Sequence, residues 1–209
     1  SLFASAIIKN HPSVNLFILN DQEEAGDFYH DMVQANGDGD ILFLPSSYRR
    51  AIKYGQKDSA NEILRTEVLS RLERKVPVTV VSYPEALAEK VVSPKTLSDK
   101  TLRLKVGQQI ETDKIAEELV GYGFEHVDYV YEPGQFATRG SIVDVYSYAS
   151  EYPYRIDFFG DEIDSIRTFE VDSQLSKEKK DSVSIVPEMA QTDGCDICFL
   201  EFLPKDAIL

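Results

Sequence analysis

Residues 131–172 read YEPGQFATRGSIVDVYSYASEYPYRIDFFGDEIDSIRTFEVD, and this stretch decides the fold of the second half of the chain. Short β-type runs alternate here with turn residues, which is typical of an antiparallel sheet. Residues 158–163 read as two strands joined by a two-residue turn, because Gly160 at the first turn position suits a type II′ hairpin. With a helix expected at 111–122, the stretch predicts a small α+β domain with an antiparallel sheet.

The run 154–159 alternates with a period of two, which separates a core face from an outer face. The core face takes Tyr154, Ile156 and Phe158, and the outer face takes Arg155, Asp157 and Phe159. Arginine beside an outward phenylalanine is typical of a protein-binding surface, and Arg139 at the entry of a neighbouring strand could join it. The alternative is an ordinary ion pair of Arg155 with Asp157 or a cross-strand acid, with Phe159 covering a hydrophobic edge.

Residues 1–95 show a different pattern, in which helical runs alternate with continuously apolar strands at 15–19, 41–44 and 78–81. That order predicts an α/β domain with a parallel sheet covered by helices on both faces. We expect this domain at 1–95, the small α+β domain at 96–181, and a return to the first domain at 182–209. In that return, Val183–Pro187 is expected to add a strand to the first sheet.

Charge argues for a protein partner rather than DNA. The net charge is −14; residues 1–94 carry 10 basic and 13 acidic side chains, and residues 95–209 carry 12 and 23. An acidic second half repels the phosphates that a nucleic-acid binder must neutralise. No apolar run is long enough for a membrane span and no signal peptide is visible, so we expect a cytoplasmic protein. The start without Met and the end at Leu209 suggest a fragment.

Three short motifs invite a chemical interpretation. The acidic run 161–164 resembles the Mg²⁺-holding box of an ATPase, but no glycine-rich phosphate loop accompanies it, so the hairpin interpretation is favoured. The run 36–40 resembles a calcium loop, yet its twelfth position is Arg49 where a Glu is needed. Cys195 and Cys198 have the spacing of half a zinc site without a second pair. We therefore expect no catalytic residue, no metal and no cofactor in this chain.

A basic, aromatic-containing run at 46–54 could hold DNA through Arg49, Arg50 and Tyr54, because basic charge with tyrosine binds single strands by stacking. A solvated loop before a helix is the other explanation of the same residues.

Two longer motifs carry a family resemblance. Residues 134–145, GQFATRGSIVDV, and residues 153–167, PYRIDFFGDEIDSIR, closely resemble the bacterial transcription-repair coupling factors, and the resemblance covers essentially the whole chain. It implies a degenerate helicase-like domain of the P-loop NTPase type, interrupted by a small domain that binds the nucleotide excision repair protein UvrA. It also implies that Arg139, Arg155 and Phe159 contact UvrA.

The resemblance implies a parent protein that is an ATP-dependent DNA translocase and displaces stalled RNA polymerase. ATP and Mg²⁺ would then bind in motor domains beyond residue 209. The expected function of this chain is a protein-interaction module of transcription-coupled nucleotide excision repair that recruits UvrA. Two alternatives remain open here: a DNA-holding, UvrB-like domain, and a nucleotide-binding remnant that uses Asp161 and Glu162.

Overall fold

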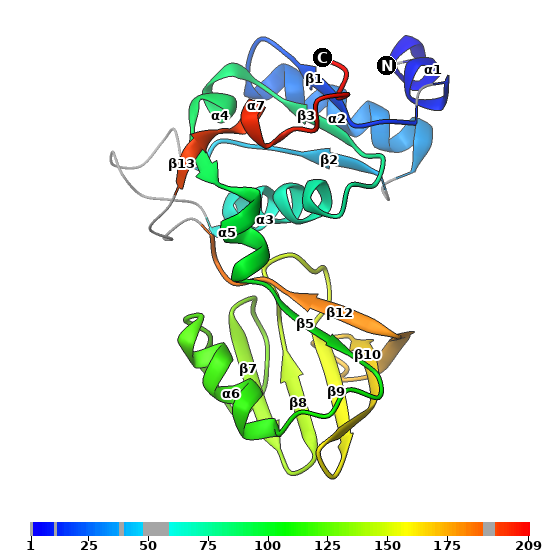
Figure 1. Cartoon of the computed structure of the whole chain (residues 1–209). Coiled ribbons are helices and arrows are strands. Elements are labelled where there is room, and N and C mark those ends of the chain that lie inside the picture. Colours follow the sequence, from blue (N-terminus) through cyan, green and yellow to red (C-terminus); the bar gives the residue numbers. More distant parts are fainter. Residues whose placement is uncertain (1, 11, 38–39, 48–58, 190–194) are drawn as a thin grey trace. The chain divides into compact units, whose positions relative to one another are not determined.

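The computed structural model of the chain describes residues 2–10, 12–37, 40–47, 59–189 and 195–209. The chain divides into two compact units (Figure 1). The first unit comprises residues 1–98 and 189–209, and the second comprises residues 99–188. The second unit begins at residue 99, three residues later than the sequence pattern suggested. The first unit resumes at residue 189, seven residues later than suggested.

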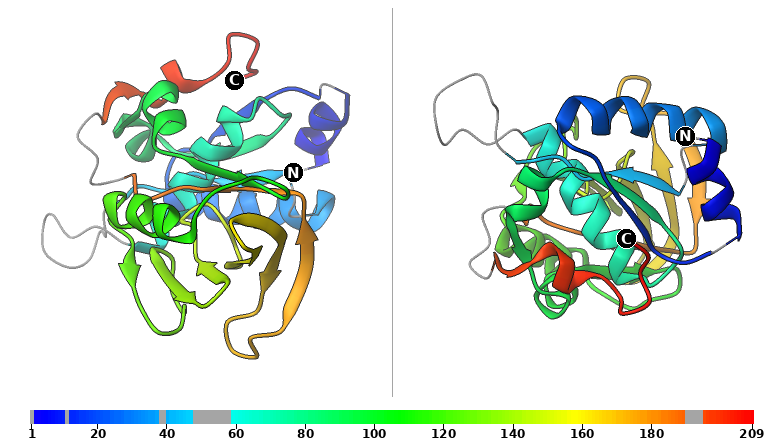
Figure 2. Two further views of the ribbon diagram at one scale, coloured as in Figure 1. Left: turned by 60° about the horizontal axis from the view of Figure 1, so that its bottom comes forward. Right: turned by 90° about the horizontal axis from the view of Figure 1, so that it is seen from above.

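A three-stranded parallel sheet organises the first unit. Its order is β1 (Asn15–Ile18), β3 (Thr79–Ser82) and β2 (Ile41–Phe43). All four residues of β3 are buried, as expected for a parallel strand covered on both faces. Helices α2 (Gln22–Asn36) and α3 (Ser59–Glu73) lie on the two sides of the sheet (Figure 2).

Helix α2 begins where the sequence predicts, because the side chain of Asp21 accepts a hydrogen bond of 3.0 Å from the backbone N–H of Glu24. Its Ala25 and Met32 are buried against Ile41 and Val81 of the sheet. The parallel α/β architecture predicted for the first part of the chain is confirmed at this level.

The remaining elements of the first unit are short. They are α1 (Leu2–Asn10), α4 (Pro84–Ala88), α5 (Pro94–Asp99), which ends at the boundary, an antiparallel pair of β4 (Lys90–Val92) with β13 (Cys195–Cys198), and α7 (Phe199–Phe202). The end of the chain returns beside β1, since the backbone N–H of Leu16 donates to the carbonyl of Ile208 at 2.8 Å.

A six-stranded sheet organises the second unit. Its order is β11 (Ser176–Lys180), β10 (Glu162–Phe169), β9 (Tyr154–Phe159), β8 (Ile142–Val145), β7 (Gln135–Arg139) and β6 (Glu125–His126). Neighbouring strands are antiparallel except β6 and β7, which are parallel. The predicted α+β domain with an antiparallel sheet is therefore confirmed as the architecture of this unit.

One face of this sheet is the core. Helix α6 (Thr112–Gly121) contributes Ile115 and Leu119 to it, and the antiparallel pair of β5 (Leu102–Lys105) with β12 (Ser182–Ile185) contributes Leu104 and Ile185. Helix α6 ends at Gly121, and after the C-cap residue Tyr122 the chain leaves the helix through the left-handed Gly123, with φ 84°. Because side chains alternate along a strand, those that do not enter this core lie on the opposite face of the sheet.

The structure corrects four local predictions. The expected return of Val183–Pro187 to the first domain's sheet is wrong, because β12 pairs with β5 and buries Val183 and Ile185 in the second unit. The sequence pattern also predicts a strand at 126–132, but only its first residue, His126, pairs with a neighbour, together with the preceding Glu125. The sequence pattern predicts no strand at 135–139 and an exposed connection at 177–181, whereas the structure has β7 at the first range and most of the second in β11.

Candidate protein-interaction surface

Strand β9 separates its side chains as the alternation predicts. Ile156 and Phe158 are buried in the core of the second unit, whereas Arg155, Asp157 and Phe159 lie on the other face. Phe159 is 84% exposed, the highest value among the large hydrophobic residues that the structure describes. The sheet therefore presents a phenylalanine to solvent at the end of a strand whose other apolar residues are buried.

The acidic run 161–164 forms the turn and first residues of a hairpin. Phe159 pairs with Glu162 across the turn, and Gly160 has φ 62° while Asp161 has no positive φ, as a type II′ turn requires. The Glu162 carboxylate accepts a hydrogen bond of 2.7 Å from the side-chain amide of Gln109. The hairpin interpretation is confirmed, and its turn holds Phe159 at the tip.

A buried carboxylate organises the two arginines. Asp144 of β8 is 1% exposed and lies opposite Arg155 in the sheet. Arg155 donates to it twice, from Nε at 2.7 Å and from Nη2 at 2.8 Å, and Arg139 donates to the same carboxylate from Nη2. Such bidentate, charge-assisted contacts fix the orientation of a guanidinium group. Arg139 and Arg155 are thus brought together, as expected, by a residue that the sequence analysis did not single out.

Arg155 is mostly enclosed. Its guanidinium carbon lies 4.3 Å from the centre of the Phe169 ring, and Nη2 donates to Oε1 of Gln174 at 3.0 Å. The side chain is 14% exposed. The hydrogen bond to Asp144 raises the pKa of Arg155 above its ordinary value, although burial alone would lower it. The alternative of an ion pair with a cross-strand acid is therefore correct for this residue, and that acid is Asp144.

Arg139 is the more accessible arginine, with a side chain that is 34% exposed. Nη1 donates to the backbone carbonyl of Asp128 at 3.1 Å, and the guanidinium lies over the ring of Tyr129 at 4.9 Å from its centre. Asp157 instead pairs with Arg167, at 2.8 Å. We call Arg139, Arg155 and Phe159 the docking face; its two arginines share one carboxylate and its phenylalanine stands apart in solvent.

The position of Asp144 on the outer face could have been predicted from the alternation of its strand, although the sequence analysis did not identify it. In the strand 142–145, Val143 and Val145 alternate into the core, so Asp144 must share the face of Arg155. Gln174 gives no comparable signal, because it follows the bulged end of β10 in a connecting turn with φ 58°. Period-two arguments do not extend into such a turn.

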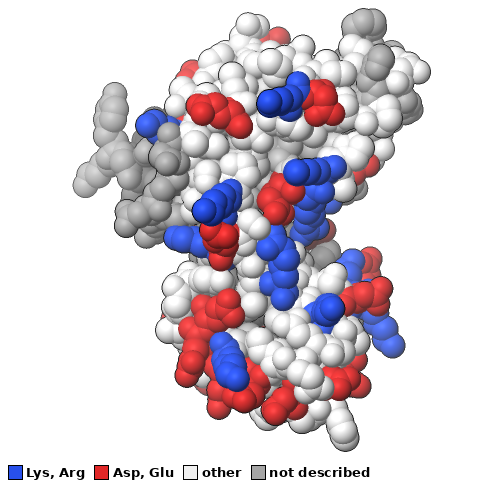
Figure 3. Space-filling model, viewed as in Figure 1, with Lys and Arg blue, Asp and Glu red and all other residues white. Residues whose placement is uncertain are grey.

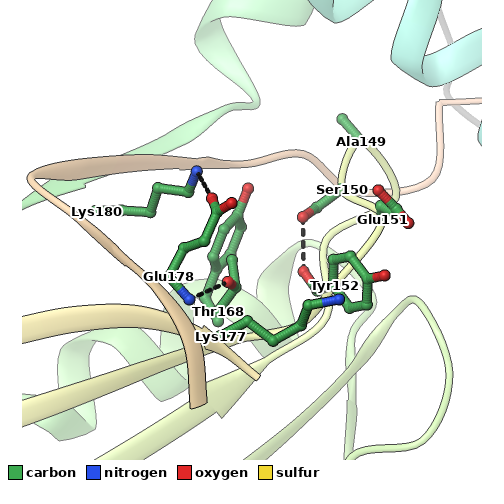
Figure 4. A pocket seen from close by; sticks show the side chains of 9 residues that line it. Ala149, Ser150, Glu151, Tyr152, Thr168, Lys177, Glu178 and Lys180 are labelled. Atoms are coloured by element: carbon green, nitrogen blue, oxygen red, sulfur yellow. Dashed lines mark hydrogen bonds and ion pairs between the residues drawn. The ribbon is translucent and has the colours of Figure 1, made fainter. Parts of the chain in front are cut away.

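A cavity of about 420 Å³ lies at the edge of the six-stranded sheet, lined by Tyr152, Lys177, Glu178 and Lys180 among others (Figure 4). Three charged side chains of the lining contact another lining residue. Lys180 pairs with Glu178 at 2.6 Å, and the Lys177 amine lies 3.6 Å from the centre of the Tyr152 ring.

The other candidate sites lie partly outside the described part of the chain. No group of three metal-ligating side chains occurs in the part of the chain that the structure describes, and no helix there could span a membrane. Cys198 is an exposed free thiol. The predicted DNA-holding residues Arg49, Arg50 and Tyr54, and Asp38 of the calcium-like loop, lie outside the described residues. Acidic side chains are spread over the visible face of the second unit (Figure 3).

One family profile and several known proteins are similar to parts of this chain. A family profile described as the UvrB interaction domain matches residues 102–190. The transcription-repair-coupling factor of Bacillus subtilis is 31% identical over 90% of this chain and 16% of its own length. That of Escherichia coli K12 is 39% identical over 57% of this chain and 10% of its own length. UvrABC system protein B of Lactococcus lactis is 34% identical over 76% of this chain and 22% of its own length.

The chain thus spans less than a quarter of the length of each of these relatives. The matched residues 102–190 coincide closely with the second unit, which carries the docking face. The second unit thus matches the UvrB interaction domain, and the chain is similar to a part of the transcription-repair-coupling factors and of UvrABC system protein B.

Proposed function

We propose that this chain is a protein-interaction module of transcription-coupled nucleotide excision repair, and that its docking face binds UvrA and so recruits it to stalled RNA polymerase. One observation carries the proposal: an 84% exposed phenylalanine stands on the same sheet face as two arginines ordered by a buried carboxylate. Aromatic residues and arginine dominate binding energy at protein interfaces. Arginines that are already ordered lose less conformational entropy on binding.

The three residues have different roles in this proposal. The Phe159 ring enters an apolar pocket of UvrA, and its burial contributes roughly 2–3 kcal/mol. Arg139 offers its remaining N–H donors to a carboxylate or carbonyl of UvrA. Arg155 adds a small exposed surface and, through Asp144, keeps Arg139 in place. The acidic character of the rest of the unit disfavours DNA as the ligand of this face.

We further propose that the first unit is a degenerate helicase-like domain that holds the UvrB interaction domain. Its parallel sheet with helices on both sides supports this. ATP hydrolysis with Mg²⁺, DNA translocation and contact with RNA polymerase are then activities of the longer parent protein, and its location is the cytoplasm. This chain acts without catalysis.

The test is calorimetric titration of the chain with purified UvrA. Phe159→Ala should weaken binding about 30-fold, because truncating a hot-spot residue costs about 2 kcal/mol. Val120→Ala is the matched control, since Val120 is also an exposed apolar residue but lies on α6, which packs on the opposite face of the sheet. Equal affinity of wild type and Phe159→Ala would refute the docking face, and absence of binding by the folded wild-type chain would refute the function.

A further inference from the structure

The connection between β6 and β7 crosses the sheet face that carries the docking face. Val127 and Val130 of this connection pack against Ala137 and the fully buried Phe169, in a small cluster separate from the main core. Tyr129 lies between these two anchors and is 53% exposed. The connection is therefore fixed on both sides of Tyr129, while the tyrosine itself remains open to solvent.

Tyr129 directly contacts Arg139. The guanidinium lies over its ring, and the neighbouring Asp128 carbonyl accepts a hydrogen bond from Nη1. With the contact to Asp144, Arg139 uses two of its five N–H donors in contacts among the described residues. Arg155, by contrast, uses four of its five N–H donors, two toward Asp144 and two toward Gln174. Arg139 therefore keeps more donors for a partner than Arg155 does, and Tyr129 covers one side of it.

We infer that Tyr129 is a further docking residue, whose ring and the adjacent Arg139 together receive a carboxylate of UvrA. This rests on the proposed function. Strand β7 lies two strands from β9, a separation of about 10 Å, and both Arg139, which Tyr129 contacts, and Phe159 lie on the docking face. A standard interface covers about 800 Å² on each partner, or roughly 28 Å across. Both aromatics fit within one interface of that size.

The partner's chemistry follows from these contacts. A carboxylate suits the remaining donors of a guanidinium, and the ring of Tyr129 excludes water from one side of that ion pair. A cation held over an aromatic ring is also restricted in its rotamers before the partner arrives. The ring, rather than the hydroxyl, is the contributing group, because the described contacts of Tyr129 are made by the ring.

An exposed tyrosine on its own is ordinary, so the experiment compares variants of one loop. Affinity for UvrA is measured for the whole chain with Tyr129→Ala, Tyr129→Phe and Tyr131→Ala. Tyr131 is the matched control, since it is 59% exposed on the same connection and makes no described contact with an arginine. Phe159→Ala reports on the docking face itself. Circular dichroism and thermal unfolding confirm that each variant is folded.

We expect Tyr129→Ala to lose roughly tenfold in affinity, and Tyr129→Phe and Tyr131→Ala to remain within about twofold of wild type. Wild-type affinity for Tyr129→Ala, with Phe159→Ala weakened, would overturn this inference and leave the proposed function standing. Equal losses in Tyr129→Ala and Tyr131→Ala would overturn the assignment to the Tyr129 ring. No binding by the wild-type chain would instead refute the proposed function.

Discussion

The most informative single substitution is Asp144→Asn, because it changes a carboxylate that no partner can reach. Asp144 is almost completely buried and accepts hydrogen bonds from both arginines of the docking face. Asparagine has nearly the same shape, but it replaces one acceptor oxygen by an NH₂ donor. Whichever way the amide is turned, that donor meets an arginine N–H, and the charge that attracts both guanidinium groups is gone.

The size of the expected loss of stability in Asp144→Asn follows from the contacts of Asp144. A hydrogen bond to a charged group contributes about 1.5–3 kcal/mol, and breaking a buried ion pair costs about 3–5 kcal/mol. Arg139 is one-third exposed and can be partly hydrated after the change, and Arg155 keeps its contacts with Gln174 and Phe169. We therefore expect the second unit to lose about 2–3 kcal/mol, below the full cost of a buried pair.

The assay is native-state hydrogen exchange of peptides that cover β8 and β9. A loss of 2–3 kcal/mol raises their exchange rates roughly 30- to 150-fold when exchange is limited by opening. Asp164→Asn is the matched control, because its carboxylate on β10 is exposed; it should change stability by less than about 0.5 kcal/mol. If Asp144→Asn behaves like Asp164→Asn, the buried carboxylate does not hold the two arginines, and the docking face is ordered by other contacts.

Three smaller predictions concern the scaffold. Gly134→Ala should destabilise the second unit by about 2 kcal/mol in urea denaturation, since φ is 88° and a Cβ would overlap the Tyr148 ring; an unchanged midpoint would contradict this. Gly26→Ala, inside α2 with open space around the added methyl, should instead stabilise by about 0.5–1 kcal/mol, and a loss would show an unseen clash. Burial, together with the hydrogen bond to Glu118, raises the pKa of Tyr122 to about 12. The unfolded group ionises near pH 10, so this stabilisation is complete below pH 10 and is lost as the pH rises through 12; the stability of Tyr122→Phe should fall less than that of wild type over that range.

The sequence predicts which side chains of β9 face outward better than it predicts the pairing of the strands around them. Alternation in β9 is short and strict, so the outward direction of Phe159 follows from the burial of Ile156 and Phe158 alone. The glycine at position 160 then fixes the turn. Both signals are local, and no distant residue can change them without exposing the core.

Pairing partners, by contrast, are not local properties. The apolar alternation of Val183 and Ile185 fits any sheet with one uncovered face, and the sequence alone cannot choose between the two units. The tract SKEKK forms β11 although all five residues are exposed, because an edge strand needs only backbone hydrogen bonds with β10. The run 126–132 does not continue as a strand, because the partly buried Val127 and the buried Val130 lie three residues apart, which is not a strand period.

The two arginines of the docking face are not equivalent, and this changes how binding data should be interpreted. Arg155 is nearly enclosed, and its removal leaves Asp144 buried with Arg139 as its only described partner. A weaker affinity of Arg155→Ala would therefore combine a lost contact with a displaced Arg139. Arg139→Ala leaves Asp144 with both bonds from Arg155, so its effect on affinity is mainly the lost contact. Arg155→Ala should accordingly reduce both stability and affinity, and Arg139→Ala mainly affinity. If Arg155→Ala is as stable as wild type yet binds weakly, Arg155 contacts the partner directly despite its enclosure.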